Sequence, residues 1–406
     1  MSGCEGENPP TRNRRERVQR KRLKYASFLV LVSLFWVSCN EEPTSIGIGL
    51  LSSQDFVRVD TTTITAVSGT TIRKHINAGS STNIMVGKFQ GYEARALLRF
   101  TGIPDTLLSA TVLSANLILK ANYRFGDQQG NLAFSVNKMT QGWTETGVNW
   151  DSISTASYEP TARGFFSAAI ADTDSVAISI DSSLVREWFQ AAAAAQGTEG
   201  IILVPTAASN KIVGFNSFQS SDASKTPRLV VTFLKGTAQD TLWFASGEDV
   251  FVANIDNLNS DPSLVYVQAG VAYRSIVKFD LSSAPSHVGV HQAMLELTLN
   301  PLVSILSSTS RLNSQSVDSL VSFFLVTSDS VDNSTLILGH RLNPDSAVYS
   351  FAITSDVQRW ISGKPNFGLQ IEAWAETSKL DLFTFFLGSA NSSLRPRLKI
   401  IYSRLL

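Results

Sequence analysis

Arg95-Ala-Leu-Leu-Arg-Phe100 is the stretch that decides the fold, because its side chains divide cleanly between the two faces of an extended chain. One face carries Ala96, Leu98 and Phe100, and the other carries Arg95, Leu97 and Arg99. The stretch therefore predicts a β-strand with an apolar core face and a mixed face.

The same pattern returns in the second half of the chain at Arg274-Ser-Ile-Val-Lys-Phe279. Four more pairs of segments follow in matching order: Ala115–Leu119 with Ala293–Leu297, Leu184–Trp188 with Asp356–Trp360, Gly200–Leu203 with Gly368–Ile371, and Pro227–Phe233 with Pro396–Tyr402. Ordered self-similarity indicates a repeated structural unit. We expect two domains, residues 54–235 and 240–406, joined by a hinge at 235–240.

Each expected domain carries one short helix. Apolar residues recur at helical spacing over Leu184–Phe189, after a candidate cap at Asp181, and Gly197 can close this helix. The second helix is expected over Val357–Ile361, before Gly363. We expect Trp188 and Trp360 to be core residues of the two domains.

Composition favours strands over long helices. Hydrophobic residues make up 43% of the 406 residues and charged residues only 17%, and alternating apolar stretches are common. The prediction is an all-β chain of two tandem β-sandwich domains with jelly-roll-like connections. The formal net charge is zero, and basic residues do not cluster in the part of the chain expected to fold. Nucleic acid is therefore not an expected partner.

The N-terminus reads as an export signal. A basic stretch over residues 12–24 runs into the apolar segment Tyr25–Val37 and then into Ser38-Cys39. The apolar segment is shorter than the ~20 residues that span a bilayer as a permanent helix. Val37-Ser38-Cys39 resembles a bacterial lipobox, which implies cleavage of residues 1–38 and lipid attachment at Cys39. The alternative is an uncleaved signal anchor with a free Cys39.

Residues 39–53 are expected to form a tether between the lipid and the first domain. The acidic residues after Cys39 resemble export signals of some Bacteroidetes outer-membrane lipoproteins. We expect a lipid-anchored protein of the outer membrane, on its periplasmic or cell-surface face. Cys4 and Cys39 are the only cysteines, so the folded body holds no disulfide framework and no multi-thiolate metal site.

The segment Gln141-Gly-Trp-Thr-Glu-Thr-Gly-Val-Asn-Trp150 holds the sharpest functional candidates. Trp143 and Trp150 offer aromatic faces that stack on sugar rings, and the carboxylate of Glu145 accepts hydrogen bonds from hydroxyls. The alternative is that the segment plugs one end of the core, with its indole N–H groups bonded to backbone. Trp150 is expected to be the plug and Trp143 the exposed ring.

Arg95 and Arg99 are candidate contacts for an anionic polysaccharide, because a guanidinium fork pairs well with uronate carboxylates. The alternative is an ion pair within the domain, with an acidic neighbour such as Glu93, or simple solvation.

The first half resembles the DNRLRE domain, a β-sandwich module of secreted bacterial proteins that is classed among carbohydrate-binding modules. The resemblance covers about residues 55–233 and rests on these landmarks: Asn77–Gly79, Arg95–Phe100, Ala115–Leu117, Gln141–Trp150, the Trp188 helix and Thr226–Val231. It implies a non-catalytic sugar-binding domain. The second half lacks the tryptophan segment, with Thr327–Val331 in its place.

No pattern in the sequence argues for catalysis. The four histidines show no metal-ligand spacing, and no nucleophile elbow or phosphate loop is present. Calcium stays open as a ligand of the loop oxygens of Asp256, Asn257 and Asp261, but these residues lack the patterned spacing of a dedicated calcium loop. Glu248 and Asp249 are expected on a solvated face. We therefore expect no enzyme and no cofactor.

Three functions from different classes remain open. The first is a binding module for polysaccharide, with the site in the first domain. The second is an adhesive or scaffold lipoprotein that binds a cell-envelope protein. The third is a glycan-active hydrolase of unrecognised type.

Overall fold

The computed structural model describes residues 58–404, except 75, 127–128, 257, 259–260, 285, 308–319, 342–345 and 389–390. The predicted signal peptide, lipidation at Cys39 and tether therefore lie outside the described residues. From Val59 onward the chain forms one compact unit. The described part contains twenty strands and two short α-helices, which confirms the predicted all-β, sandwich-like fold class.

The first sheet is built from ten strands that lie between residues 83 and 255. These are β2 (Asn83–Phe89), β3 (Tyr92–Phe100), β4 (Thr111–Gly126), β5 (Leu132–Met139), β6 (Tyr158–Ala168), β7 (Ser175–Ser179), β8 (Ile201–Pro205), β9 (Lys211–Asn216), β10 (Arg228–Lys235) and β11 (Ala238–Ile255). They pair in the order β11-β10-β4-β9-β2-β3-β8-β5-β6, with β7 against β4. Since β11 also pairs with β3, the sheet closes on itself. We call these strands, with their helix, the first body.

The second sheet is built from the other ten strands. These are β1 (Val59–Arg73), β12 (Leu264–Gln268), β13 (Tyr273–Phe279), β14 (Val288–Thr298), β15 (Leu320–Leu325), β16 (Val331–Arg341), β17 (Val348–Ala352), β18 (Leu369–Ala373), β19 (Leu382–Phe386) and β20 (Arg397–Arg404). They pair in the order β1-β20-β14-β17-β16-β15-β18-β13-β12-β19, and β1 also pairs with β13. We call this set the second body.

Strand pairing follows the same plan in both bodies. β3 bonds to β2, β8 and β11, and β13 bonds to β12, β18 and β1. The closing strands β10 and β20 occupy matching places beside β4 and β14. This shared pairing plan agrees with the predicted repeat. That the two halves are copies of one domain family stays a prediction.

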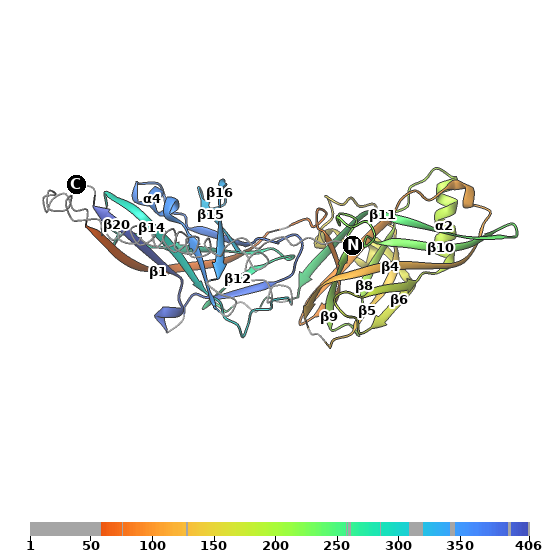
Figure 1. The fold of residues 1–406 in the computed structure, drawn as a ribbon, viewed down its shortest axis with the longest axis horizontal. Helices are drawn as coiled ribbons and strands as arrows, with labels where there is room; N and C mark the ends of the chain where they lie inside the picture. The colour runs from red at the N-terminus through yellow and green to blue at the C-terminus, as the bar shows by residue number, and fades with distance from the viewer. Residues whose placement is uncertain are drawn as a thin grey trace, which may run out of the picture. The chain divides into compact units, whose positions relative to one another are not determined.

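The two bodies exchange their first strands. β1 opens the first predicted domain, yet residues 59–65 pair with β20 and residues 66–73 pair with β13 (Figure 1). β11 opens the second predicted domain, yet residues 238–245 pair with β10 and residues 246–255 pair with β3. The domain boundaries 54–235 and 240–406 stay predictions. In the structure, the first strand of each of these two segments pairs with strands of the other segment.

The hinge expected at 235–240 is wrong. Lys235 pairs with Ala238, so the chain reverses through a tight hairpin turn at Gly236-Thr237. Gly236 has φ +64°, a left-handed conformation that favours glycine. The junction is therefore a continuous β-ribbon, because both flanking strands belong to one sheet.

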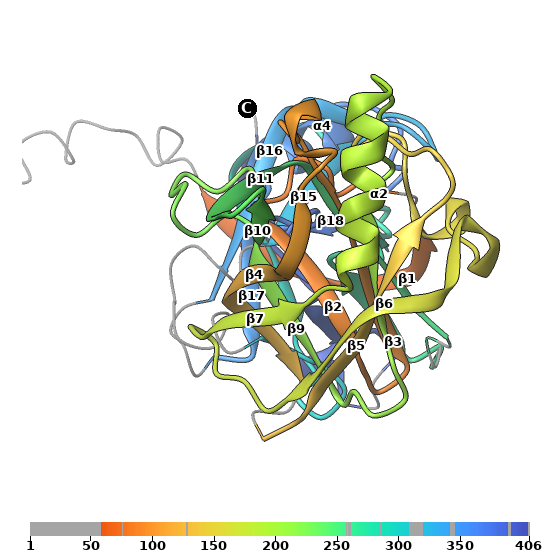
Figure 2. The same cartoon turned by 90° about the vertical axis from the view of Figure 1, so that its right-hand side faces the viewer.

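Both predicted helices are present. α2 (Ser182–Ala193) begins as expected after Asp181, whose carboxylate accepts the N–H of Ser183, and it packs on β4 of the first body (Figure 2). The residue that turns left-handed after α2 is Ala195, with φ +54°, and not Gly197 as expected. α4 (Thr354–Ile361) is followed by Gly363, with φ +92°. No helix in the described ranges is long and apolar enough to cross a membrane.

Trp188 and Trp360 lie in the cores, as predicted. Trp188 is buried against Phe100, with ring centroids 5.8 Å apart, and Trp360 is buried against Phe324 at 5.7 Å. Both faces of β3 are covered. Leu98 belongs to the main core of the first body, whereas Leu97 belongs to a second apolar cluster on the opposite face. That second cluster positions the site.

Candidate functional site

The tryptophan segment Gln141–Trp150 covers the mixed face of β3. Hydrogen bonds from the side chain of Asn77 hold the segment in place. The Asn77 amide donates to the carbonyl oxygens of Glu145 at 2.7 Å and Val148 at 2.8 Å. Its own oxygen accepts the N–H of Gly79 at 2.9 Å. A Cβ at position 79 would lie 2.3 Å from the Glu145 carbonyl oxygen, so only glycine allows this close approach.

Two arginines of β3 stack on the two tryptophans of this segment. The Arg95 guanidinium lies 4.6 Å from the Trp150 ring centroid, and the Arg99 guanidinium lies 4.7 Å from that of Trp143. A cation over an indole face is attracted by the ring quadrupole. Alternation along β3 places both arginines on one face, and this is why both stacks form.

Trp143 is a buried plug and not an exposed ring. Only 7% of its surface is exposed, and its indole N–H donates to the carbonyl oxygen of Glu199 at 2.8 Å. Trp150 is only half-buried. The expectation that Trp143 would be the exposed ring of the pair is therefore wrong, and the alternative of a plug bonded to backbone is confirmed for Trp143.

Arg95 is occupied by an ion pair within the first body. Its Nε donates to Glu93 Oε1 at 2.7 Å, and Lys88 Nζ lies 3.0 Å from the other oxygen of Glu93. This is the intradomain alternative that the sequence left open.

Arg99 joins three segments of the chain. Nη1 donates to Glu248 Oε2 at 2.8 Å, and Nη2 donates to Glu199 Oε2 and to the Trp143 carbonyl oxygen, both at 2.8 Å. The solvated face expected at Glu248-Asp249 is wrong for Asp249, whereas the side chain of Glu248 is 39% exposed. Glu248 is ion-paired, and Asp249 is only 1% exposed and accepts the N–H of Phe218.

Burial raises the pKa of Asp249 to about 7. The Phe218 N–H and the hydroxyl of Ser246 lower this pKa, and the nearby charge of Glu145 raises it further. Removal from water disfavours the charged carboxylate more than these hydrogen bonds favour it.

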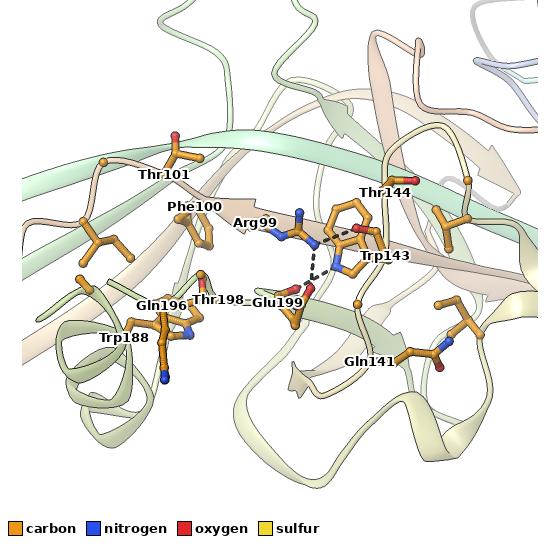
Figure 3. Close-up of a pocket in the computed structure, with 18 of the residues that line it drawn as sticks. Arg99, Phe100, Thr101, Gln141, Trp143, Thr144, Trp188, Gln196, Thr198 and Glu199 are labelled. Carbon is orange, nitrogen blue, oxygen red and sulfur yellow. Dashed lines mark hydrogen bonds and ion pairs between the residues drawn. The ribbon is translucent and has the colours of Figure 1, made fainter. Parts of the chain in front are cut away.

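A cleft of about 890 Å³ opens beside Arg99 and Trp143. Its lining is Arg99–Ile103, Gln141–Thr144, Gly147, Val148, Ser152, Ile153, Trp188, Ala192 and Gln196–Glu199. Arg99, Trp143 and Glu199 point toward one another, with Gln196 on the α2 side and Gln141 on the side of the tryptophan segment (Figure 3). The lining combines apolar side chains with amides, hydroxyls, one guanidinium and one carboxylate.

Two of the five predicted site residues line this cleft. They are Arg99 and Trp143, whereas Arg95, Trp150 and Glu145 lie outside its lining. Glu145 Oε1 instead accepts the Gln219 amide at 2.9 Å. Their ligand-binding roles stay predictions.

Glu199 and Glu248 were missed by sequence reasoning. Each pairs with Arg99 from a distant place in the chain, 100 and 149 residues away. Local periodicity carries no signal for such pairs.

The described residues contain no group of three or more histidine, cysteine, aspartate or glutamate side chains arranged for a metal ion. Of the three residues considered for calcium, Asn257 lies outside the described residues. Asp261 Oδ1 is engaged by the N–H and hydroxyl of Ser263, at 2.8 and 2.7 Å.

Comparison with known proteins bears on residues 60–233, which include most strands of the first body. No curated protein matches the chain. The crystal structure of the infectious bursal disease virus VP2 subviral particle aligns with 10% identity over 86% of this chain and 78% of that chain. Its TM-score of 0.12 is too low to carry an argument. Residues 60–233 match the model of carbohydrate-binding module family 96, so this segment holds a carbohydrate-binding-module-like domain.

Proposed function

We propose that the first body is a non-catalytic module that binds polysaccharide in the cleft beside Arg99 and Trp143. The observation that carries the proposal is one of position. Every residue that lines the cleft falls between 99 and 199, inside the segment that matches the carbohydrate-binding family.

The size and chemistry of the cleft suit a sugar chain. Its volume of about 890 Å³ is in the range of small-molecule binding sites. Partly exposed apolar residues such as Ile103 and Ala192 offer surface for the C–H faces of sugar rings. Gln141, Thr144 and Gln196, which are exposed, offer amide and hydroxyl groups to sugar hydroxyls.

We further propose that the module is lipid-anchored through Cys39 and faces the periplasm or the cell surface from the outer membrane. This part rests on the likeness of Val37-Ser38-Cys39 to a lipobox. We also propose that the second body is a divergent copy of the DNRLRE-type unit that serves as a spacer, because it lacks the tryptophan segment.

The test fills the cleft without disturbing its walls. A Cβ built at Gly197 meets no atom within 4 Å, and its φ is not one that requires glycine, so Gly197→Trp places a bulky ring in open space. Trp143 is unsuitable for this purpose because it is buried, and its removal would unsettle the fold. Leu302→Trp is the matched control, since Leu302 is 93% exposed and outside the cleft.

The proteins are compared on a panel of immobilised polysaccharides. We expect binding by the unaltered protein and by Leu302→Trp, and loss of binding in Gly197→Trp with the unfolding midpoint unchanged. If the unaltered protein binds no glycan, the polysaccharide-binding proposal is contradicted, and the alternative of a scaffold that binds cell-envelope proteins is favoured.

A further inference from the structure

The cationic group of the cleft is already neutralised by the protein. Arg99 contacts two carboxylates at 2.8 Å, Glu199 on one side and Glu248 on the other. Its own side chain is only 20% exposed, whereas those of Glu199 and Glu248 are 40% and 39% exposed. The triad therefore presents its acidic members to solvent more than its basic one.

Arg99 offers an acidic ligand no edge with two free donors, because both Nη2 hydrogens are engaged and Nε is buried. Nη1 and Nη2 serve the two glutamates and the Trp143 carbonyl oxygen, and Nε is buried without a partner among the described residues. Its planar face rests on Trp143. A uronate could form a bidentate pair with this guanidinium only by displacing one of its present partners, among them the two glutamates that each contact it through one oxygen.

The formal charge at the cleft also opposes an anion. Arg99 and Glu199 are the charged members of the lining, and Glu248 adds a second carboxylate to the same arginine. One cation with two carboxylates leaves a formal charge of −1. A like charge brought to a partly desolvated site is unfavourable, and the absence of a compensating lysine or histidine in the lining leaves this repulsion unopposed.

The remaining polar groups suit uncharged hydroxyls. Glu199 Oε2 serves Arg99, while Oε1 accepts no hydrogen bond from the described residues. A carboxylate oxygen that faces a cleft is a strong acceptor for a sugar hydroxyl. The Gln196 amide, three residues before Glu199 and just after the end of α2, supplies both a donor and an acceptor.

We infer that the cleft takes an uncharged glycan and discriminates against uronate-bearing chains, with Glu199 Oε1 accepting a hydrogen bond from a sugar hydroxyl. This inference rests on the proposed function and adds the charge class of its ligand. It departs from the anionic polysaccharide that the two arginines of β3 suggested, because both arginines are paired within the protein.

The test uses the whole protein and pairs of polymers that differ in charge. The probes are polygalacturonate with its methyl ester, carboxymethylcellulose with hydroxyethylcellulose, and a neutral set of β-glucan, mannan, xylan and galactan. We expect calorimetric binding to neutral members, with an affinity that rising salt leaves unchanged. A charged polymer that binds as tightly as its neutral counterpart, or more tightly, would overturn the inference and leave the proposed function standing. Binding to no polymer of either set would overturn both.

Two charge variants separate Glu199 from acidic groups elsewhere. Glu199→Gln keeps the shape of the side chain and is expected to weaken neutral-glycan binding by about tenfold, the usual scale for a hydrogen bond to a charged group. Glu187→Gln is the matched control, because Glu187 is also ion-paired, its side chain is 34% exposed and it lies outside the lining, and it is expected to leave the affinity unchanged. Full affinity in a folded Glu199→Gln variant would contradict the role given to Glu199.

Discussion

Arg99 Nη1 donates a hydrogen bond of 2.8 Å to Glu248 Oε2, which lies 149 residues further along the chain. The bond joins β3 to β11, two strands that also pair along their length. Residues 60–233 match the carbohydrate-binding family, so β11 completes the first body from outside the matched segment. A site that depends on Arg99 therefore depends on both halves of the chain.

Loss of Arg99 should destabilise the protein measurably. Arg99→Met removes three hydrogen bonds and the stack on Trp143, and we expect the free energy of unfolding to fall by about 2–3 kcal/mol. Urea denaturation measures this change. Arg186→Met, at an exposed position of α2, is the control, with an expected change within about 0.5 kcal/mol. Equal stabilities of the two variants would show that the triad contributes nothing.

Strand exchange can be tested by disulfide trapping. Thr63 of β1 lies opposite Lys399 of β20, at a pairing distance that a disulfide can bridge. In a protein with Cys4 and Cys39 changed to serine, Thr63→Cys with Lys399→Cys should cross-link within one chain. Val230 of β10 holds the place that matches Lys399, opposite Trp243 of β11. Thr63→Cys with Val230→Cys should therefore stay reduced, and its cross-linking would show that β1 completes the first body instead.

Asp249 should make stability depend on pH. Burial raises its pKa from 3.8 to about 7, so the folded state holds a proton that the unfolded state has lost between these values. The free energy of unfolding should fall as pH rises from about 4 to about 7, by on the order of 4 kcal/mol, and stay level above. Asp249→Asn should flatten this slope in urea titrations at several pH values. An unchanged slope in Asp249→Asn would assign the titration to another group.

Asp356 of α4 corresponds to Leu184 of α2 in the predicted repeat. Both carboxylate oxygens of Asp356 are buried without a hydrogen-bond partner in the described part of the chain. Burial raises its pKa to about 6, although Arg359 lowers it. Asp356→Leu should therefore raise the free energy of unfolding at pH 8 by about 1–3 kcal/mol. Well below pH 3.8, the ordinary pKa of this carboxyl, the group is protonated in both states and the gain should shrink. A loss of stability in Asp356→Leu at pH 8 would contradict this explanation.

The sequence predicted elements far better than it predicted partners. The strand at Arg95–Phe100 and the helix after Asp181 follow from local side-chain periods and a local cap, and both are present. The exchange of β1 and β11 carries no such signal. The two bodies offer similar partner strands. The alternation of side chains in β1 or β11 is therefore compatible with pairing in either body. Only the actual pairing with β20 or β10 decides.

The candidate site was predictable only where its residues are near neighbours. Arg99 and Trp143 were found through the pattern of β3 and the tryptophan segment. Glu199 and Glu248 were not, because their role comes from pairing across 100 and 149 residues. The burial of Trp143 depends on the distant Glu199 carbonyl and on Asn77, which the spacing of aromatic residues does not reveal.

The most direct test of the central claim is backbone hydrogen exchange, measured with and without a saturating polysaccharide identified on the panel. A glycan in the cleft predicts slowed exchange in three separate segments, around residues 99–103, 141–148 and 196–199. Protection confined to the second body, or to the face of the first body that carries the exposed Trp243, would contradict the assignment of the site.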